Sequence, residues 1–451
     1  MISRLKDLPG KGNFRRGIHP PDAKEYAAEQ PIEVLPTPSK VSIPLVQHIG
    51  APCQTTVKPR QEVALGDPVG QAGAFVSAPV HATVNGKTGM ASVATLPNGR
   101  HVSTVPITAG EEQLSGEALR EEIYGGEWPT ENLQEHTPEQ IAEAVRSAGI
   151  VGMGGAAFPT HVKLTRNEAK PVDTLLLNGC ECEPYLTADY RLMLEHPEPI
   201  ITGALLAAHG CGAEQVIIAI EDNKPQAVET MRIAAAGTGI KVAVVDTKYP
   251  MGGERQAVLA VLGREVPTAG LPLDVGVVVL NVGTASAIAR AVLRGKPLTH
   301  RIITVSGGGV EQAKNLLAPI GVSYGDLLEC CGGAKHEAGR VIAGGPMMGF
   351  ALADLDTPVT KGTSGMTVLT HEEIHDIEET TCIRCGRCVD VCPLHLVPTK
   401  AALASKARDW DLCKKYQLSA CCECGCCGYI CPAGIPLVQL MRMGKALMPR
   451  D

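Results

Sequence analysis

Aromatic residues are scarce in this chain of 451 residues, which contains two tryptophans, eight tyrosines and four phenylalanines. Basic residues are also outnumbered, because 41 lysines and arginines stand against 48 aspartates and glutamates, for a net charge of −7. Proteins that bind nucleic acids need a basic surface, and those that bind single strands also use aromatic rings on which bases stack. The composition therefore predicts no nucleic-acid binding.

Long hydrophobic runs are missing as well. Apolar runs such as Val277–Leu280 are far shorter than the roughly 18 residues that a membrane-spanning helix requires. The first residues, MISRLKDLPGKGNFRRG, carry charge but neither the apolar segment nor the small-residue cleavage site of a secretory signal. We therefore expect no direct insertion into a bilayer and a location inside the cell.

Cysteine, in contrast, is abundant and unevenly distributed. The chain has 17 cysteines, and 11 of them lie between residues 382 and 431. Thiols inside the cell are kept reduced, so a disulfide scaffold is disfavoured for a chain without a signal peptide. Metal or cluster ligation is then the leading explanation for this density.

Two segments of this region share the spacing C-x2-C-x2-C-x3-C-P. In two-cluster ferredoxins, three thiolates of such a run bind one cluster and the fourth binds the other. Zinc sites are the alternative, but tetrahedral zinc needs neither the third cysteine nor the proline. The spacing therefore predicts two [4Fe–4S] clusters, one held by Cys382, Cys385, Cys388 and Cys431, and one held by Cys392, Cys421, Cys424 and Cys427. Three further cysteines are expected to be buried fillers, namely Cys413, Cys422 and Cys426.

The chain divides into segments of different composition. Residues 1–40 are rich in proline, glycine and charge and lack periodicity, which is typical of an arm that docks on another surface. Short β-type runs between residues 41 and 110 indicate a small all-β unit. Short strands with one helix near Gly325–Cys331 indicate an α+β unit at 298–370, and the cysteine-rich segment occupies 371–451.

Strands and helices alternate between residues 137 and 297. Thr137, Pro138 and Gln140 have the pattern of a capped helix start. Four apolar runs follow, separated by helical stretches, which indicates βαβ units in a parallel sheet. These runs are Val172–Leu177, Val216–Ile220, Val242–Val245 and Val275–Leu280. Polar and glycine-rich loops follow each run, and we expect them to converge at the carboxyl ends of the strands, where open parallel sheets bind ligands.

A glycine-rich turn precedes the first of these strands. Gly152, Gly154 and Gly155 lie near Lys163, a combination with which backbone N–H groups and one cation can approach a phosphate. The turn matches neither the Rossmann fingerprint nor the P-loop spacing, so a purely structural turn is the alternative. Glu181 and Glu183 share the loop after the first strand, where they could bind hydroxyl or amide groups or form a solvated turn.

The order of these segments resembles a known family. GMGGAAFPTHVK, NGCECEP, YPMGGE and NVGT are similar to the FMN and NADH site of the complex I flavoprotein subunit. A closer resemblance is to the C subunits of Rnf ion-translocating electron transport complexes, and it also covers GIHPPDAKE, IPLVQHIGAPC, VSAPVHATVNG, GGPMMG and both cysteine runs. This resemblance spans nearly the whole chain.

The resemblance implies a multidomain fold of α/β and α+β type. It implies an N-terminal barrel-sandwich unit similar to lipoyl carriers at 41–110 and a Rossmann-like FMN- and NADH-binding domain at 137–297. It further implies an SLBB β-grasp domain at 298–370 and a helical ferredoxin-type domain with two clusters at 371–451. No lysine lies in VSAPVHATVNG, where a carrier would be modified, so carrier function is not expected.

The resemblance also implies residues for the cofactors. The phosphate and ring region of FMN would be held by Gly152, Gly154, Gly155, Phe158 and Lys163. The flavin and nicotinamide site would be completed by Asn178, Glu181, Glu183, Glu254 and Asn281. Glu183 and Glu254 are expected to orient the nicotinamide or the flavin, because hydride transfer needs orientation more than a proton shuttle. Cys180 and Met153 replace an aspartate and an arginine of the complex I pattern, which leaves the choice of NADH over NADPH open.

The implied function is that of an NADH/ferredoxin oxidoreductase subunit of a membrane-bound, ion-translocating complex. Electrons would pass between NAD(H), FMN and the two clusters, and indirectly ferredoxin, since a flavin takes up two electrons and a cluster only one. The chain is expected on the cytoplasmic face of the inner membrane, held by membrane and cluster-bearing subunits, with its arm ordered by a neighbour. The alternatives are a soluble carrier that serves a cytosolic reductase or hydrogenase, and a non-enzymatic cluster scaffold.

Overall fold

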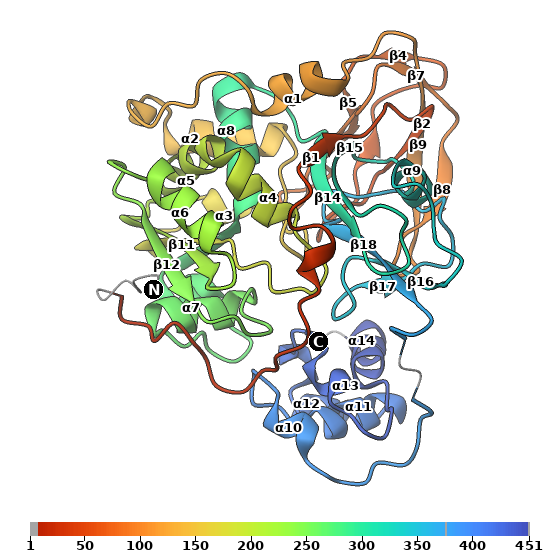
Figure 1. The fold of residues 1–451 in the computed structure, drawn as a ribbon. Helices are drawn as coiled ribbons and strands as arrows, with labels where there is room; N and C mark the ends of the chain where they lie inside the picture. Colours follow the sequence, from red (N-terminus) through yellow and green to blue (C-terminus); the bar gives the residue numbers. More distant parts are fainter. Residues whose placement is uncertain (1–7, 375–376, 450–451) are drawn as a thin grey trace.

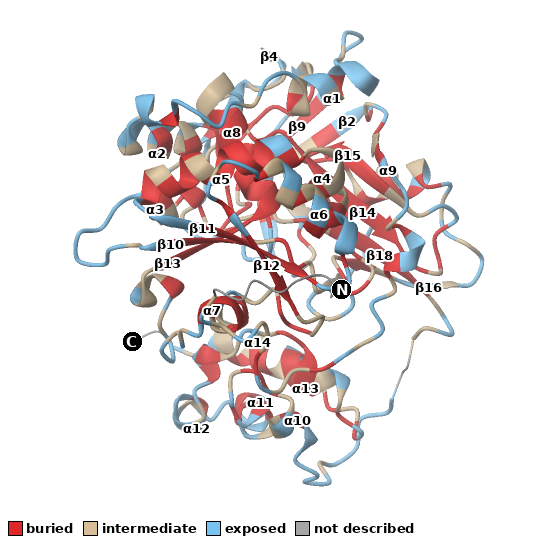
Figure 2. Ribbon diagram, turned by 60° about the vertical axis from the view of Figure 1, so that its left-hand side comes forward, coloured by how far each residue is buried: buried red, intermediate tan, exposed pale blue. Residues whose placement is uncertain are grey.

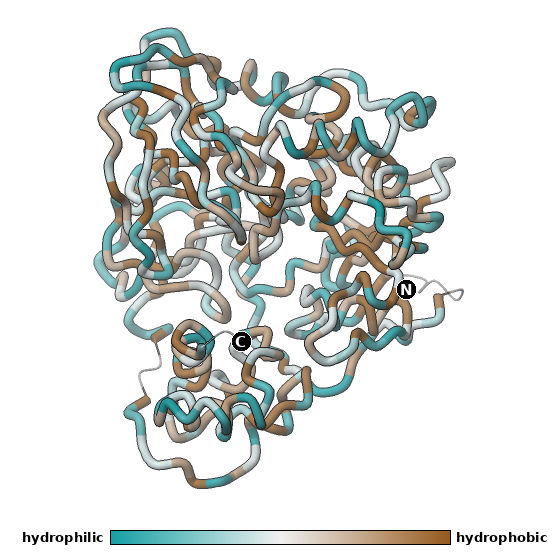
Figure 3. Tube along the Cα trace, turned by 180° about the vertical axis from the view of Figure 1, so that it is seen from behind, coloured by the Kyte–Doolittle hydropathy of each residue, from teal (hydrophilic) through white to brown (hydrophobic). Residues whose placement is uncertain are grey.

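The computed structural model describes residues 8–374 and 377–449. Within these residues, four β-sheets lie above a helical module that contains the cysteine runs (Figure 1). No helix of this described part combines the length and the apolar character needed to cross a bilayer. Figure 3 shows the same trace from behind, coloured by hydropathy, with many apolar stretches (brown) inside the upper part and many hydrophilic stretches (teal) at its outer edge.

Residues 40–109 form a small barrel-sandwich of two sheets. The larger sheet has the order β2-β9-β7-β4, with β8 paired to β9, and the smaller has the order β3-β5-β6. Val41, Ile43, Val80 and Ile107 are buried in the shared core. The strands are β2 (Lys40–Pro44), β3 (Gln54–Thr55), β4 (Glu62–Val63), β5 (Pro68–Gln71), β6 (Val80–His81), β7 (Gly86–Thr88), β8 (Ser92–Thr95) and β9 (His101–Ala109).

A helical connection leads from the barrel to the parallel sheet. It contains α1 (Gly116–Tyr124), a 3-10 turn η2 (Leu133–Glu135), α2 (Pro138–Ser147) and α3 (Thr160–Leu164). The predicted start of α2 is confirmed, because the Gln140 N–H donates to the Thr137 hydroxyl and the Thr137 N–H donates to the Gln140 side chain. This reciprocal cap satisfies two backbone donors that the first turn would otherwise leave free.

The four predicted parallel strands form one sheet with the order β12-β11-β10-β13. The chain runs outward from β10 through β11 to β12, and β13 then returns to the other side of β10. This reversal creates a topological switch point between β10 and β13, where open α/β sheets bind ligands. The strands are β10 (Thr174–Asn178), β11 (Gln215–Glu221), β12 (Lys241–Val245) and β13 (Val277–Asn281).

Helices cover both faces of the parallel sheet (Figure 2). One face, with Leu175 and Ile218, packs against α4, α5, α6 and α8, and the other, with Leu176 and Ile217, packs against α7 and Phe14 of the arm. Since both faces are buried, the strands are continuous apolar runs rather than alternating ones. We call β10–β13 and these helices the parallel-sheet module. Its helices are α4 (Ala188–Glu195), α5 (Pro197–Cys211), α6 (Pro225–Ala234), α7 (Glu254–Leu262) and α8 (Val282–Arg294), with a 3-10 turn η3 (Pro272–Val275) before β13.

A six-stranded mixed sheet follows, with the order β1-β15-β14-β18-β16-β17. Helix α9 packs on it through Tyr324 and Leu327. We call β14–β18 and α9 the mixed-sheet module. Its elements are β14 (His300–Ser306), β15 (Lys314–Pro319), α9 (Tyr324–Cys330), β16 (Ala338–Ala343), β17 (Phe350–Ala351) and β18 (Gly365–Thr370). The sixth strand, β1 (Ile32–Val34), comes from the N-terminal arm and pairs in parallel with β15.

The described part of the N-terminal arm, residues 8–39, packs along its own chain. Figure 1 shows it in red, passing beneath α7 and beside the helical module before it reaches β1. Ile18 pairs with Tyr249, and Lys24, in the 3-10 turn η1 (Lys24–Tyr26), donates to the Leu186 carbonyl at 2.6 Å. The expectation that a neighbouring subunit orders this arm is therefore wrong for these residues. No local pattern indicated this docking, since the Lys24 contact spans 162 positions.

The C-terminal region is a small helical module, which we call the cysteine module. Ala401, Ala402, Leu437 and Met441 form part of its core. Its elements are α10 (Arg387–Asp390), α11 (Pro398–Lys406), α12 (Trp410–Lys415), the 3-10 turn η4 (Leu418–Ala420), α13 (Cys426–Tyr429) and α14 (Leu437–Leu447). The repeated spacing produces repeated structure, because α10 and α13 each begin inside a cysteine run, directly after a glycine with φ of 78° or 87°.

Candidate functional site

Asn178 and Asn281 end the two strands that flank the switch point. They are register partners at the carboxyl ends of β10 and β13. The Asn178 amide donates to the Gly252 carbonyl at 2.7 Å, which joins the loop after β10 to the loop after β12. Asn281 accepts from the Gly283 N–H at 2.8 Å and thereby caps α8. The loops after these strands therefore meet at one edge of the sheet, as the sequence predicted.

The glycine-rich turn lies directly over Asn281. A Cβ added at Gly154 would be 3.0 Å from the Asn281 Cβ, whereas one added at Gly155 would meet no atom within 4 Å. The Gly152 N–H donates to the Phe158 carbonyl at 2.8 Å, which closes the turn. The turn is thus fixed on one side and open on the other, so a ligand can approach its backbone closely.

Lys163 reaches the same edge from α3. Its ammonium donates to Glu254 Oε1 at 2.6 Å and to the Val279 carbonyl at 3.0 Å. Glu254 begins α7, where the helix dipole favours a carboxylate. The structure therefore joins two of the predicted site residues in an ion pair. A phosphate bound here would share Lys163 with Glu254.

Glu181 caps α4 beneath this edge. Its carboxylate accepts the N–H groups of Asp189 at 2.8 Å and Tyr190 at 3.1 Å. Asp189 in turn accepts from the Asn281 amide at 2.6 Å. Burial, and then the charge of Glu181, raise the pKa of Asp189 to about 7. Sequence reasoning missed Asp189, because an acidic residue in the first turn of a helix is an ordinary feature.

Glu183 is engaged by partners from two other segments. Its Oε1 accepts the N–H groups of Met347 at 2.7 Å and Met348 at 3.1 Å, and its Oε2 lies 3.3 Å from the Tyr249 hydroxyl. Burial raises the pKa of Glu183. Both carboxylate oxygens of Glu183 thus have protein partners, and the contacts with Met347 and Met348 join the parallel-sheet module to the mixed-sheet module. A role of Glu183 in orienting the nicotinamide stays a prediction.

Arg301 supports the glycine-rich turn from the neighbouring mixed sheet. Its guanidinium donates to the Met153 carbonyl at 3.3 Å and to the Lys361 carbonyl. The Met153 N–H also donates to the Thr284 hydroxyl at 2.9 Å. Burial lowers the pKa of Arg301 to about 10, so it remains a cation at neutral pH. A signal for Arg301 was present in the sequence, because it is a charged residue inside the strand HRIITVS.

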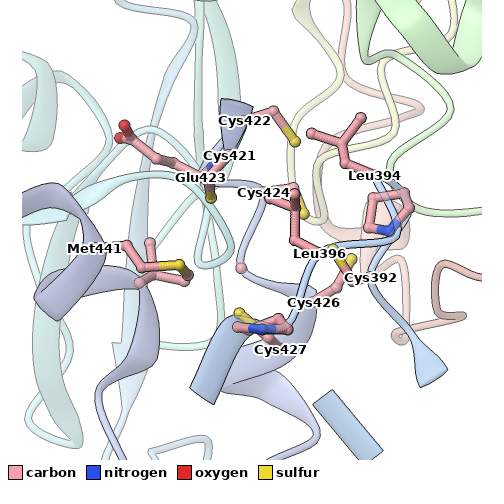
Figure 4. A pocket seen from close by; sticks show the side chains of 14 residues that line it. Cys392, Leu394, Leu396, Cys421, Cys422, Glu423, Cys424, Cys426, Cys427 and Met441 are labelled. Atoms are coloured by element: carbon pink, nitrogen blue, oxygen red, sulfur yellow. Dashed lines mark hydrogen bonds between the residues drawn. The ribbon is translucent and has the colours of Figure 1, made fainter. Parts of the chain in front are cut away.

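Six cysteines line one cavity of the cysteine module, which has about 340 Å³ of empty space, part of it open to solvent (Figure 4). Four of them are the predicted ligands of the second cluster, Cys392 from the first run and Cys421, Cys424 and Cys427 from the second, and the other two are Cys422 and Cys426. The structure thus brings together the four thiols predicted for the second cluster. Burial and the neighbouring thiols raise the pKa of Cys427 to about 12, so a bound cation is needed to keep this set deprotonated. This donor set suits an iron–sulfur cluster.

The other predicted set is less enclosed. Cys388 and Cys431 are buried in the module core, Cys382 is half-buried and Cys385 is exposed. Cys382, Cys388 and Cys431 belong to one apolar cluster, together with Leu437 of α14. The first cysteine run therefore lies between the core of the module and its outer surface.

The cysteines outside the spacing differ from one another. Cys413 and Cys426 are buried, as expected of fillers. Cys422 is exposed, so the expectation that it is a buried filler is wrong, and both Cys422 and Cys426 line the cavity. Across residues 8–374 and 377–449, no three or more His, Cys, Asp or Glu side chains are arranged to hold a single metal ion.

Several known proteins are similar to this chain. It is 44% identical over 391 residues to the C subunit of the proton-translocating ferredoxin:NAD(+) oxidoreductase complex of Clostridium ljungdahlii, covering 87% of this chain and 84% of that protein. It is 43% identical over 405 residues to the C subunit of the Na(+)-translocating complex of Acetobacterium woodii, covering 89% of each. A third relative, from Rhodobacter capsulatus, is 41% identical, covering 96% of this chain and 82% of the relative. The chain belongs to the RnfC family.

Models of four domain families match successive parts of this RnfC chain. They are the RnfC barrel sandwich hybrid domain at 12–112, the Nuo51 FMN-binding domain at 145–290, the SLBB domain at 302–351 and a 4Fe-4S binding domain at 375–395. The predicted fold class is confirmed, and the chain carries an FMN-binding domain and a 4Fe-4S binding domain. The barrel model begins at residue 12 and so includes most of the arm.

Proposed function

We propose that this RnfC chain binds FMN at the switch point between β10 and β13 and exchanges hydride with NAD(H) there. The observation that carries this proposal is the pairing of Asn178 with Asn281 beneath an open glycine-rich turn. Backbone N–H groups at Gly154 and Gly155, with the Lys163 ammonium, suit the flavin phosphate. Bound flavin would supply the chemistry that takes up two electrons as hydride and releases them singly.

The side chains around this site have distinct roles in the proposal. Glu254 holds the Lys163 ammonium in position until the phosphate binds. Asn281 fixes the base of the turn and donates to Asp189. Burial raises the pKa of Asp189, which favours the protonated form of its carboxyl beside the site. Glu181 caps the first turn of α4 and so holds Asp189 in position.

We further propose two [4Fe–4S] clusters in the cysteine module. One uses the cavity set of Cys392, Cys421, Cys424 and Cys427, and the other uses Cys382, Cys385, Cys388 and Cys431. The support is the doubled spacing, together with the cavity that gathers the first of these sets.

The names of the relatives support assembly into an ion-translocating complex. We propose a peripheral position on the cytoplasmic face of the inner membrane, where membrane and cluster-bearing subunits hold the chain and electrons pass toward or from ferredoxin. The relatives favour this assembly over a soluble carrier. Two of them are named for different ions, so the proposal specifies no ion.

Cofactor content and NADH reduction test this function together. Protein purified without oxygen should hold about one FMN and about eight irons, and NADH should bleach the flavin absorbance. Saturation at about four irons, or zinc in their place, would contradict the cluster assignment. FMN-loaded protein that NADH does not bleach would contradict the oxidoreductase assignment.

A further inference from the structure

The second cysteine run is in direct contact with the parallel-sheet module. The Tyr249 hydroxyl, in the loop after β12, donates to the Cys424 carbonyl at 2.6 Å. Cys424 and Cys426 are buried in one apolar cluster with Tyr249 and Ile18, and Cys182 packs against it from the loop after β10. Two of the loops that form the proposed flavin site therefore also touch this cysteine run.

The GGPMMG turn of the mixed-sheet module is the second contact. Glu183 accepts the N–H groups of Met347 and Met348, which ties this turn to the parallel-sheet module. A Cβ added at Gly425 would lie 2.6 Å from the Met347 carbonyl, so only glycine allows the cysteine run to approach so closely. Arg442 of α14 donates to the Met348 carbonyl at 2.8 Å and fixes the same turn from below.

The N-terminal arm is the third contact. Arg16 donates to the Val389 carbonyl at 2.8 Å, and the Gly17 N–H donates to the Val391 carbonyl at 3.0 Å. The next residue of the arm, Ile18, pairs with Tyr249. The arm thus connects the backbone directly before Cys392 to Tyr249, whose hydroxyl donates to the Cys424 carbonyl.

The start of the first cysteine run is open to solvent. Cys385 is exposed, and so are Arg384 and Arg387 on either side of it. Ile383, next to Cys382, also exposes 66% of its surface. An exposed cluster ligand between two arginines suits contact with an acidic electron-transfer partner.

We propose that the cluster held by Cys392, Cys421, Cys424 and Cys427 is the inner one, which exchanges electrons with the flavin, and that the cluster held with Cys385 is the outer one, which serves the partner. Tyr249 and Glu183 are positioning residues that keep the inner cluster against the flavin site. Each transfer moves one electron, and no bond forms or breaks. The inference rests on the proposed function, in which NAD(H) supplies or accepts the electrons.

A matched pair of variants of the full chain tests the order of the clusters. Cys385→Ser and Cys424→Ser each remove one ligand, and freeze-quench EPR follows the remaining cluster. The rate at which NADH reduces this cluster is measured, and so is the rate at which NAD+ reoxidises it after reduction by dithionite. One of these two directions is thermodynamically favourable whatever the potential of the cluster. We expect the wild-type rate in Cys385→Ser and a rate at least about tenfold lower in Cys424→Ser. Equal rates, or the reverse order, overturn the proposal.

A second set of variants tests the positioning residues. Tyr249→Phe removes the hydroxyl that donates to the Cys424 carbonyl, and Tyr429→Phe, at an exposed tyrosine of α13, is the control. We expect Tyr249→Phe to change the EPR signal of the inner cluster and to slow its exchange with NAD(H), with the control unchanged. Glu183→Ala should behave like Tyr249→Phe, whereas Glu183→Gln should preserve the junction, because its amide can accept from Met347 and donate to Tyr249.

The dithionite-reduced EPR signal separates this inference from the proposed function. It requires neither NADH nor bound flavin, so a changed signal in Tyr249→Phe supports the junction even if NADH fails to bleach the flavin. A signal and a rate that match wild type in both Tyr249→Phe and Glu183→Ala overturn the positioning role.

Discussion

Lys163 has two acceptors in the structure, the Glu254 carboxylate and the Val279 carbonyl. If it also binds the flavin phosphate, Lys163→Ala removes a charge-assisted hydrogen bond of about 1.5–3 kcal/mol. The dissociation constant for FMN, measured by fluorescence titration of flavin-depleted protein, should then rise about tenfold to hundredfold.

A second ion-paired lysine provides the control for this measurement. Lys170 pairs with Asp274 at 2.5 Å, outside the proposed site. Lys170→Ala should leave FMN affinity unchanged. Full FMN retention in Lys163→Ala would show that the phosphate lies elsewhere.

Residues with a local pattern could be predicted from the sequence, and residues defined by distant contacts could not. The spacing rule grouped Cys392 with the second cysteine run, and the structure places all four thiols around one cavity. Asp189, Arg301 and Tyr249 were missed, because the contacts that give them a role span 92, 148 and 175 positions. No short motif encodes such contacts.

At the scale of elements, the cap of α2 makes a local prediction. Thr137→Ala removes the hydroxyl that accepts the Gln140 N–H, which should destabilise the first turn by about 1 kcal/mol. Amide hydrogen exchange in the first turn of α2 should then rise about fivefold. Thr130→Ala, at an exposed loop position, is the control and should leave this exchange unchanged. Equal protection in both variants would show that tertiary packing alone holds the turn.

The arm makes a second prediction at this scale. Arg16→Ala removes a hydrogen bond between the arm and the cysteine module, which should weaken their docking by about 1 kcal/mol. Limited proteolysis between the mixed-sheet module and the cysteine module should become about fivefold faster. The neighbouring Arg15 is exposed, so Arg15→Ala should leave the rate unchanged. Equal cleavage of both variants would indicate that the arm does not contribute to docking.

Long apolar elements were predicted better than short ones. All four strands of the parallel sheet were identified, although β13 begins at Val277 rather than Val275, because Pro272–Val275 forms a 3-10 turn. Strand β1 was not identified, since three residues, Ile32–Val34, are too few to show an alternating pattern. It exists because β15 offers an edge to pair with.

Over the whole molecule, buried neutral histidines couple stability to pH. Burial lowers the pKa of His81 and of His300 to about 3. The unfolded chain binds these protons below about pH 6.5 and the folded chain does not, so stability is complete above that pH and falls toward pH 3. Each residue should cost about 1.4 kcal/mol per pH unit in this range.

Urea unfolding at pH 7 and pH 5 measures this effect. The midpoint should fall with pH in the wild type and fall less in His300→Gln. His101 is exposed, so His101→Gln should keep the wild-type slope. The cofactors are the same in all three proteins, so their own acid sensitivity cancels in the comparison. An unchanged slope in His300→Gln would contradict the coupling.

The pairing of β1 with β15 also constrains how the chain folds as the ribosome makes it. Glu33 of β1 and its ion-pair partner Lys314 at the start of β15 are 281 residues apart. At about 5–20 residues per second, the arm emerges roughly 15 to 60 seconds before this partner exists. During that interval the parallel sheet can form and the arm before β1 can pack on it, whereas β1 has no strand to join. We therefore expect proteases to cut at β1 in nascent chains arrested before residue 314, and to spare β1 in chains arrested well beyond the exit of β15.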